Sequence, residues 1–211
     1  MNLNDYLKLY LILETSMLRL PLGDFIIQAI EGGVTAIQLR DKTENARERY
    51  ETAKALKSLI ADKDVLFIIN NNADLAICAG AHGVHLGIED MPPQAVKKAF
   101  PELITGYSCN NPDDCTLAIS AKVDYTGIGP VYFTPTKTNL RPVLGVQGVS
   151  DLAAALPMPK VAIGGINSEN IGELAGSKVS GVAVSSALCQ SEMPYDEAVN
   201  MRKMVEKYER V

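Results

Sequence analysis

Basic side chains stand directly after two apolar runs of this sequence. Arg40 and Lys42 follow the run that ends at Leu39, and Lys137 closes the segment Thr134-Pro135-Thr136-Lys137. Cationic side chains held together stabilise the negative charge that develops on a departing phosphate or diphosphate. Each of these residues alone would be read as a solvated surface charge. The indication of phosphate chemistry therefore depends on their being brought together.

Two pairs of small residues could bind phosphate through the backbone. Gly164-Gly165 and Ser185-Ser186 each follow an apolar run. Glycine lets an anion approach the backbone closely because it has no Cβ, and N–H groups at a helix start bind phosphate readily. A Gly-Gly pair after a strand can also be an ordinary turn. The sequence leaves both interpretations open.

Asn71 and Asp90 offer oxygen atoms that suit Mg²⁺. This ion takes one or two protein carboxylates and fills its other positions with water and substrate phosphate. Glu89 is a nearby alternative carboxylate. The Glu89-Asp90 pair precedes Met91-Pro92-Pro93, and it can equally be an acidic pair that merely introduces a helix.

The two histidines and the hydroxyl side chains give no sign of covalent or zinc chemistry. His85 stands between Val84 and Leu86, so we interpret it as a core residue, and neither it nor His82 is assigned a catalytic role. The GxSxG and HExxH patterns are absent from the sequence. Hydrolysis through an activated nucleophile or zinc is therefore disfavoured.

The elements that must position these residues alternate regularly. Short β-branched runs are separated by segments of helical periodicity, which is typical of parallel βα units. We expect strands over 10–13, 36–40, 66–70, 83–86, 104–108, 125–129, 160–163 and 181–185. We expect helices over 22–31, 45–61, 73–79, 93–99, 113–121, 149–156, 169–174 and 196–208. Eight such pairs favour a closed (β/α)8 TIM barrel over a doubly wound sheet.

A closed barrel would bring the polar residues together at one end. Gln38, Asn70 and Ser108 lie at or near the ends of expected strands, as do the residues named above. Active sites of such barrels lie at the C-terminal ends of the strands. We therefore expect one site at that end of the barrel.

The composition fits one globular domain over residues 1–211. Hydrophobic residues make up 47% of the 211 residues. The net charge of −5 argues against nucleic acid and anionic membranes as partners. No apolar run reaches membrane-spanning length, and we find no signal peptide. The four cysteines follow no metal or redox spacing, which favours reduced thiols in the cytoplasm. A homo-oligomer is left open.

Motifs along the whole chain resemble those of the thiamine phosphate synthase family. They are, in order, QLRDK at 38–42, NN at 70–71, GVHLGIED at 83–90, GPVY at 129–132, TPTK at 134–137, AIGGI at 162–166 and GVAVSSA at 181–187. The resemblance implies a (β/α)8 barrel that joins hydroxymethylpyrimidine diphosphate to hydroxyethylthiazole phosphate. The products would be thiamine phosphate and pyrophosphate.

The resemblance also implies roles for individual residues. Positions that hold the pyrimidine diphosphate are matched by Gln38, Arg40, Lys42, Asn70, Ser108 and Lys137, of which Arg40, Lys42, Ser108 and Lys137 would be catalytic. Contacts to the thiazole phosphate are matched by Thr134, Thr136 and the backbone of Gly165, Ser185 and Ser186. Asp90 matches a Mg²⁺ ligand. The implied mechanism is dissociative, with diphosphate leaving before the thiazole nitrogen attacks, so it needs charge neutralisation rather than a strong base.

The chain departs from the family pattern at three positions. Asn71 replaces an aspartate that binds Mg²⁺, Ile88 replaces glutamine, and Asn110 replaces a frequent histidine. An asparagine oxygen can coordinate Mg²⁺ but brings no charge. Two alternatives share the fold: a thiazole tautomerase, which would rely on a histidine near Asn110, and a non-catalytic sensor of thiamine precursors.

Overall fold

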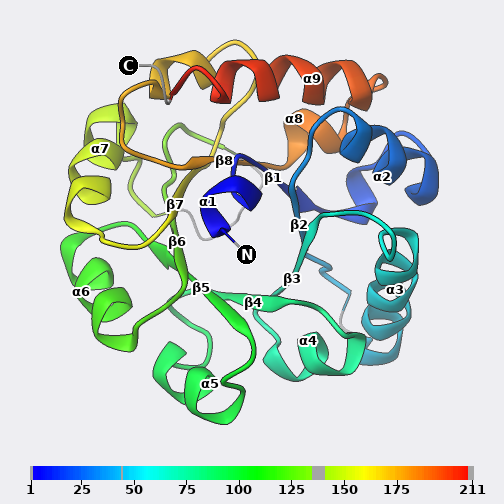
Figure 1. Ribbon diagram of the computed structural model, residues 1–211, viewed down its shortest axis with the longest axis horizontal. Helices are drawn as coiled ribbons and strands as arrows, with labels where there is room; N and C mark the ends of the chain where they lie inside the picture. The colour runs from blue at the N-terminus through cyan, green and yellow to red at the C-terminus, as the bar shows by residue number, and fades with distance from the viewer. Residues whose placement is uncertain (1, 44, 135–140, 209–211) are drawn as a thin grey trace.

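The computed structural model describes residues 2–43, 45–134 and 141–208. Its strands close into a parallel barrel in chain order, with β1 pairing both β2 and β8. The strands are β1 (Leu9–Leu13), β2 (Ala36–Leu39), β3 (Leu66–Asn70), β4 (Gly83–Leu86), β5 (Ile104–Cys109), β6 (Tyr125–Ile128), β7 (Lys160–Ile163) and β8 (Gly181–Val184). Figure 1 looks along this ring of strands, with the helices arranged around it. The expected (β/α)8 barrel is confirmed.

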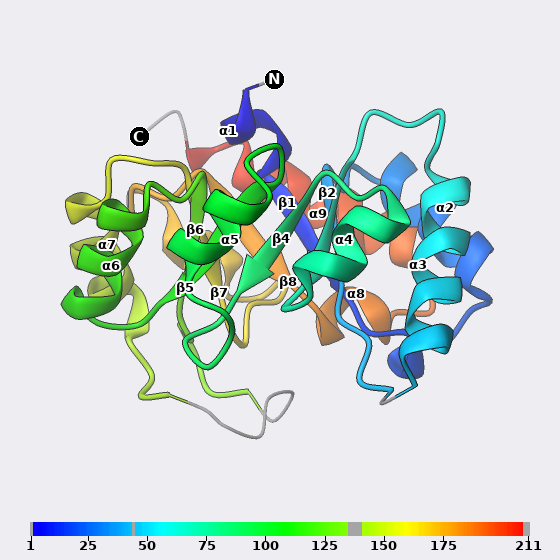
Figure 2. The ribbon, with the colours of Figure 1, turned by 90° about the horizontal axis from the view of Figure 1, so that it is seen from below.

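Helices lie on the outside of the barrel. They are α2 (Leu22–Glu31), α3 (Ala46–Leu59), α4 (Ala73–Ala79), α5 (Pro93–Ala99), α6 (Pro112–Ala121), α7 (Gly145–Ala155), α8 (Ser186–Cys189) and α9 (Pro194–Val205). Of these, α2 to α7 connect successive strands, and α8 and α9 follow β8. A first short helix, α1 (Leu3–Tyr6), lies at the end of the barrel opposite the loops that follow the strands (Figure 2). No helix among the described residues is both long and apolar enough to span a membrane.

Side-chain alternation along the strands separates two cores. In β1, Leu9, Leu11 and Leu13 pack outward into the cluster shared with the helices. Tyr10 and Ile12 point inward into a second cluster that fills the barrel. This is the period-two pattern of a strand, applied to a sheet that is covered on both faces.

Local capping explains where the outer helices begin. The Asn45 side chain accepts hydrogen bonds from Arg47 N and Glu48 N at the start of α3. Asn111 does the same for Asp114 N in α6, whose first residue is Pro112. An amide oxygen satisfies N–H groups that lack a partner within the helix, and proline is tolerated in the first turn.

The expected helix over 169–174 is wrong in type and extent. The structure has a 3-10 helix there, η2 (Ile171–Leu174). Ile171 and Leu174 are three residues apart and both are buried, which suits the three-residue period of a 3-10 turn. Asn167 accepts hydrogen bonds from Glu169 N and Asn170 N and holds the chain in a turn just before it. Three further elements were not expected: α1, α8 and the 3-10 helix η1 (Thr15–Met17).

Candidate active site

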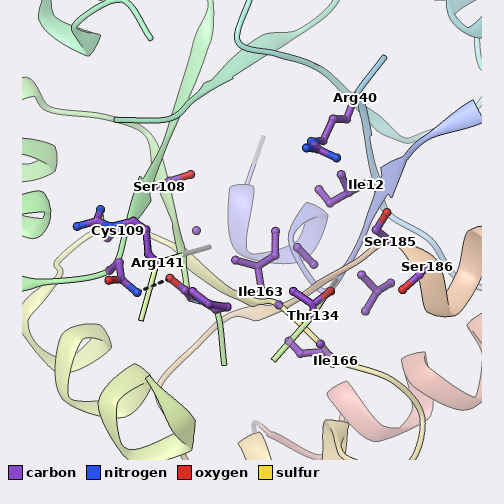
Figure 3. Close-up of a pocket in the computed structure, with 18 residues that line it drawn as sticks. Ile12, Arg40, Ser108, Cys109, Thr134, Arg141, Ile163, Ile166, Ser185 and Ser186 are labelled. Carbon is purple, nitrogen blue, oxygen red and sulfur yellow. Dashed lines mark hydrogen bonds between the residues drawn. The ribbon is translucent and has the colours of Figure 1, made fainter. Parts of the chain in front are cut away.

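A cavity of ≈ 170 Å³ opens at the C-terminal ends of β1, β2 and β5–β8. Figure 3 shows Arg40 and Ser185 on one side of it and Ser108 and Arg141 on the other. Among the residues expected at the site, its lining includes Arg40, Ser108, Thr134, Gly165, Ser185 and Ser186. Expected residues from five separate stretches of the sequence therefore meet around one space.

The other expected residues lie elsewhere. Gln38 is buried inside the barrel beneath the strand ends, where its amide donates to Tyr10. Asn70 is the last residue of β3, whereas Lys42, Asn71 and Asp90 follow β2, β3 and β4, and none of the four is part of the cavity lining. Thr136 and Lys137 fall outside the described residues.

Glu14 is a site residue that the sequence analysis missed. It follows β1 directly, and its side chain is only 4% exposed. One carboxylate oxygen accepts from Arg40 Nη1 at 2.9 Å, and the other lies 2.5 Å from Lys42 Nζ. Glu14 thus neutralises one of these two positive charges and fixes both side chains. An acidic residue after the first strand was the only signal in the sequence.

Arg141 is a second missed residue, and it lines the cavity. Its Nη1 lies 2.5 Å from Asp114 Oδ2, whose side chain is 5% exposed. The same oxygen accepts from Asn110 N at 2.8 Å. Buried carboxylates hold guanidinium groups in fixed orientations through such charge-assisted bonds. The cavity therefore has a positioned cation on the β5 side as well as Arg40 on the β2 side.

Asn110 stands where the tautomerase alternative would place a histidine. Its Nδ2 donates to Gly129 O and to Pro142 O, each at 2.9 Å. It ties the end of β6 to the segment ahead of α7. An amide has no ionisable proton to exchange, so Asn110 serves a structural purpose here.

The Gly164-Gly165 pair is required by local packing. Gly165 has φ +67°, and a Cβ on it would lie 2.7 Å from Phe133 O and 2.8 Å from Tyr132 Cβ. Gly164 O accepts from Tyr132 N at 3.0 Å. The loop after β6 is thus packed against these glycines. The need for glycine here follows from the turn and this contact even without a bound anion.

The proposed metal ligands follow the adjacent strands β3 and β4. Asn71 has φ +66°, and its N–H donates to His85 O at 2.8 Å. Asp90 Oδ2 accepts from Gly87 N at 2.6 Å, and Glu89 is exposed. No group of three or more His, Cys, Asp or Glu side chains suited to a metal occurs within residues 2–43, 45–134 and 141–208. A Mg²⁺ ion held by one carboxylate, one amide oxygen, substrate phosphates and water needs no such group, so this donor set fits it.

Thiols near the cavity are electrically neutral. Burial raises the pKa of the Cys109 thiol, which lines the cavity. Burial likewise raises the pKa of Cys189, to about 11. A thiol must ionise to act as a nucleophile. Neither residue is suited to covalent chemistry.

Comparison with known proteins gives consistent results along the chain. The family model described as thiamine monophosphate synthase matches residues 9–188. The thiamine-phosphate synthase of Methanococcus maripaludis is 38% identical over 211 residues, 99% of each chain. That of Albidiferax ferrireducens is 39% identical over 186 residues, 88% of this chain and 85% of the relative. The solved structure of thiamine phosphate pyrophosphorylase from Pyrococcus furiosus has a TM-score of 0.89 at 37% identity, covering 98% of this chain and 99% of that one.

Proposed function

The chain belongs to the thiamine monophosphate synthase family, and we propose that it joins hydroxymethylpyrimidine diphosphate to hydroxyethylthiazole phosphate. The carbon–oxygen bond to the diphosphate breaks, and a carbon–nitrogen bond forms to the thiazole ring. Thiamine phosphate and pyrophosphate leave. The protein is accordingly a transferase, which we place in the cytoplasm with small molecules as its partners.

The observation that carries this proposal is the convergence around one cavity of residues that match both substrate sites. Arg40 and Ser108 match the pyrimidine diphosphate site, whereas Thr134, Gly165 and Ser185 match the thiazole phosphate site. The two substrates would therefore bind side by side, which is what bond formation between the methylene carbon of the pyrimidine and the thiazole nitrogen requires. Holding two reactants in attack geometry supplies a large share of such a rate enhancement.

The cationic side chains would take up the charge of the leaving group. Arg40 and Lys42 are already oriented by Glu14, so little reorganisation is needed when diphosphate departs. Arg141 lies in the same connection between β6 and α7 as Thr134, which matches the thiazole phosphate site, so it would act on that phosphate. When bound near Asn71 and Asp90, Mg²⁺ would supply further neutralisation of the diphosphate.

Product formation tests this proposal directly. The protein is mixed with both substrates and Mg²⁺, and thiamine phosphate and pyrophosphate are quantified. Arg40→Ala should lower turnover by about 10²–10³, as for loss of one preorganised charge-stabilising group. Arg47→Ala is the matched control, because Arg47 is exposed on α3, away from the cavity lining, and should keep wild-type turnover.

Each alternative predicts a different result. A tautomerase would isomerise the thiazole phosphate without consuming the pyrimidine diphosphate. A sensor would bind both precursors in calorimetry and release no pyrophosphate. Either outcome would replace the proposed synthase activity.

A further inference from the structure

A chain of hydrogen bonds crosses the barrel interior from β2 to β5. Gln38 Nε2 donates to the Tyr10 hydroxyl at 2.9 Å, and this hydroxyl lies 2.8 Å from that of Tyr125. The Tyr125 hydroxyl lies 3.0 Å from His85 Nδ1, and His85 Nε2 lies 3.0 Å from Ser108 Oγ. Gln38 and Ser108, at its two ends, are both expected to hold the pyrimidine diphosphate. The resemblance implies no functional role for the three residues between them.

Glycine makes room for the middle of this chain. The rings of His85 and Tyr125 lie with centroids 5.4 Å apart. A Cβ on Gly106 would lie 2.5 Å from His85 Nδ1 and 2.2 Å from Tyr125 Cζ. A Cβ on Gly127 would lie 3.3 Å from His85 Cε1. The next two strands along the barrel, β5 and β6, thus carry glycine beside the His85 ring, so the contact is built into the barrel.

The donors and acceptors allow the protons of this chain to be ordered. An amide nitrogen only donates, so the Tyr10 oxygen accepts from Gln38. Tyr10 then donates to Tyr125, which is its only other hydrogen-bond partner among the described residues. Tyr125 in turn donates to His85 Nδ1. The remaining ring proton lies on His85 Nε2, which donates to Ser108 Oγ.

The opposite proton order, in which the hydrogen bonds run from Ser108 toward Tyr10, is disfavoured because it leaves a buried donor without a partner. If Ser108 donated to His85 and His85 to Tyr125, then Tyr125 would donate to Tyr10. The Tyr10 proton would be left without a partner in a barrel where this residue is 1% exposed. A buried unsatisfied donor costs about 1–3 kcal/mol. Burial also raises the pKa of Tyr10 and of Tyr125, so both phenols keep the protons that this order requires.

We propose that Tyr125 and His85 are positioning residues, which fix the imidazole proton on Nε2 and so direct the Ser108 hydroxyl proton into the cavity. Ser108 lines the cavity and already accepts a hydrogen bond from His85. It is therefore presented to a ligand as a donor. The matching ligand group is a hydrogen-bond acceptor, such as a pyrimidine ring nitrogen or a diphosphate oxygen. This last step rests on the proposed function, whereas the proton order does not.

Nitrogen NMR tests the proton order without any activity measurement. The chain has two histidines, so ¹⁵N-histidine labelling of wild type and His82→Asn assigns His85. The expected spectrum shows a protonated Nε2 and an unprotonated Nδ1. In Tyr125→Phe, which removes the donor to Nδ1, a larger share of the Nδ1–H form is expected. A protonated Nδ1 in wild type would overturn the proposal.

A pair of substitutions at His85 separates positioning from packing. Glutamine can place an amide N–H near the position of Nε2 and keep the bond to Ser108, whereas asparagine reaches only the position of Nδ1. Both remove the same ring, so a purely structural role predicts equal losses. We expect kcat with the pyrimidine diphosphate to be at least about tenfold higher for His85→Gln than for His85→Asn, with similar thermal midpoints. Equal kcat values would overturn the positioning role, and absence of thiamine phosphate with wild type would instead refute the proposed function.

Discussion

Glu14 Oε2 accepts a hydrogen bond from Arg40 Nη1 over 2.9 Å, at the point where β1 and β2 end side by side. The second oxygen of the same carboxylate forms an ion pair with Lys42 Nζ at 2.5 Å. A negative group thus lies beside the proposed diphosphate site, although it opposes anion binding. Its contribution must be to hold the two cations in place before substrate arrives.

Glu14→Gln should therefore lower kcat, although it removes a charge that repels diphosphate. Misplaced catalytic groups cost on the order of 10²-fold in rate, and we expect a loss of about that size in kcat. The KM for the pyrimidine diphosphate should change little, because the lost repulsion offsets the lost orientation. Steady-state kinetics with Glu14→Asp as the charge-conserving control would check this, and an unchanged kcat in Glu14→Gln would contradict it.

Arg141 should matter for the thiazole phosphate. Hydrogen bonds to charged groups contribute about 1.5–3 kcal/mol, so Arg141→Ala should raise the Kd for this substrate by roughly tenfold to a hundredfold. Asp114→Asn keeps an acceptor for Asn110 N and should cause a smaller rise by loosening Arg141. Isothermal titration of both substrates gives the comparison. Equal weakening of the two would argue against a divided site.

The strands could be predicted from the sequence because barrel strands are short apolar runs buried on both faces. The boundaries expected for β3, β4 and β7 match those of the structure. The partners of Arg40 could not be predicted in this way. Glu14 lies 26 positions earlier in the chain, and their contact depends on which way each side chain leaves its strand end.

The polar interior of the barrel was partly foreseen. His85 was expected to be a satisfied core residue, and it is buried with bonds to Tyr125 and Ser108. Sequence periodicity could not predict that His85 bonds to Ser108, which is a residue of the candidate site. That relation depends on closure of the barrel, which sets inward-facing residues of different strands against one another.

His82 should make the fold sensitive to mild acid. The Nδ1 atom of His82 accepts a hydrogen bond from Phe67 N at 2.9 Å. Burial is the main cause that lowers the pKa of His82, and the positive charge of Lys57 lowers it further. The unfolded chain, with an ordinary histidine pKa of about 6.5, then binds more protons than the folded one. The free energy of unfolding should fall as the pH drops below about 6.5 and level off below the folded-state pKa.

Urea denaturation over a pH series measures this effect. His82→Asn can still accept from Phe67 N through its side-chain oxygen but does not titrate in this range. Its free energy of unfolding should decline less steeply than that of wild type between roughly pH 6.5 and 5. Parallel curves for the two proteins would remove His82 as the cause.

Asn71 lies where the family resemblance implies a Mg²⁺-binding aspartate, so replacing it with aspartate tests the metal site. Its backbone has φ +66°, a conformation that aspartate also tolerates better than most residues. Asn71→Asp should thus leave the fold intact while adding a charged oxygen near Asp90. Hard cations bind more tightly as ligand charge rises. We expect a several-fold lower Mg²⁺ concentration at half-maximal pyrophosphate release.

Two controls define which oxygens the metal contacts. Asp90→Asn keeps an acceptor for Gly87 N but loses the charge, so it should raise the Mg²⁺ requirement. Glu89→Gln should raise it only if this exposed carboxylate compensates for Asn71. Thermal midpoints with Mg²⁺ and pyrophosphate give a second readout, since a ligand that binds the folded state raises stability in proportion to RT ln(1 + [L]/Kd). Identical Mg²⁺ dependence in wild type and Asn71→Asp, by both readouts, would show that residue 71 does not contact the metal and would leave Asp90 as its sole proposed ligand.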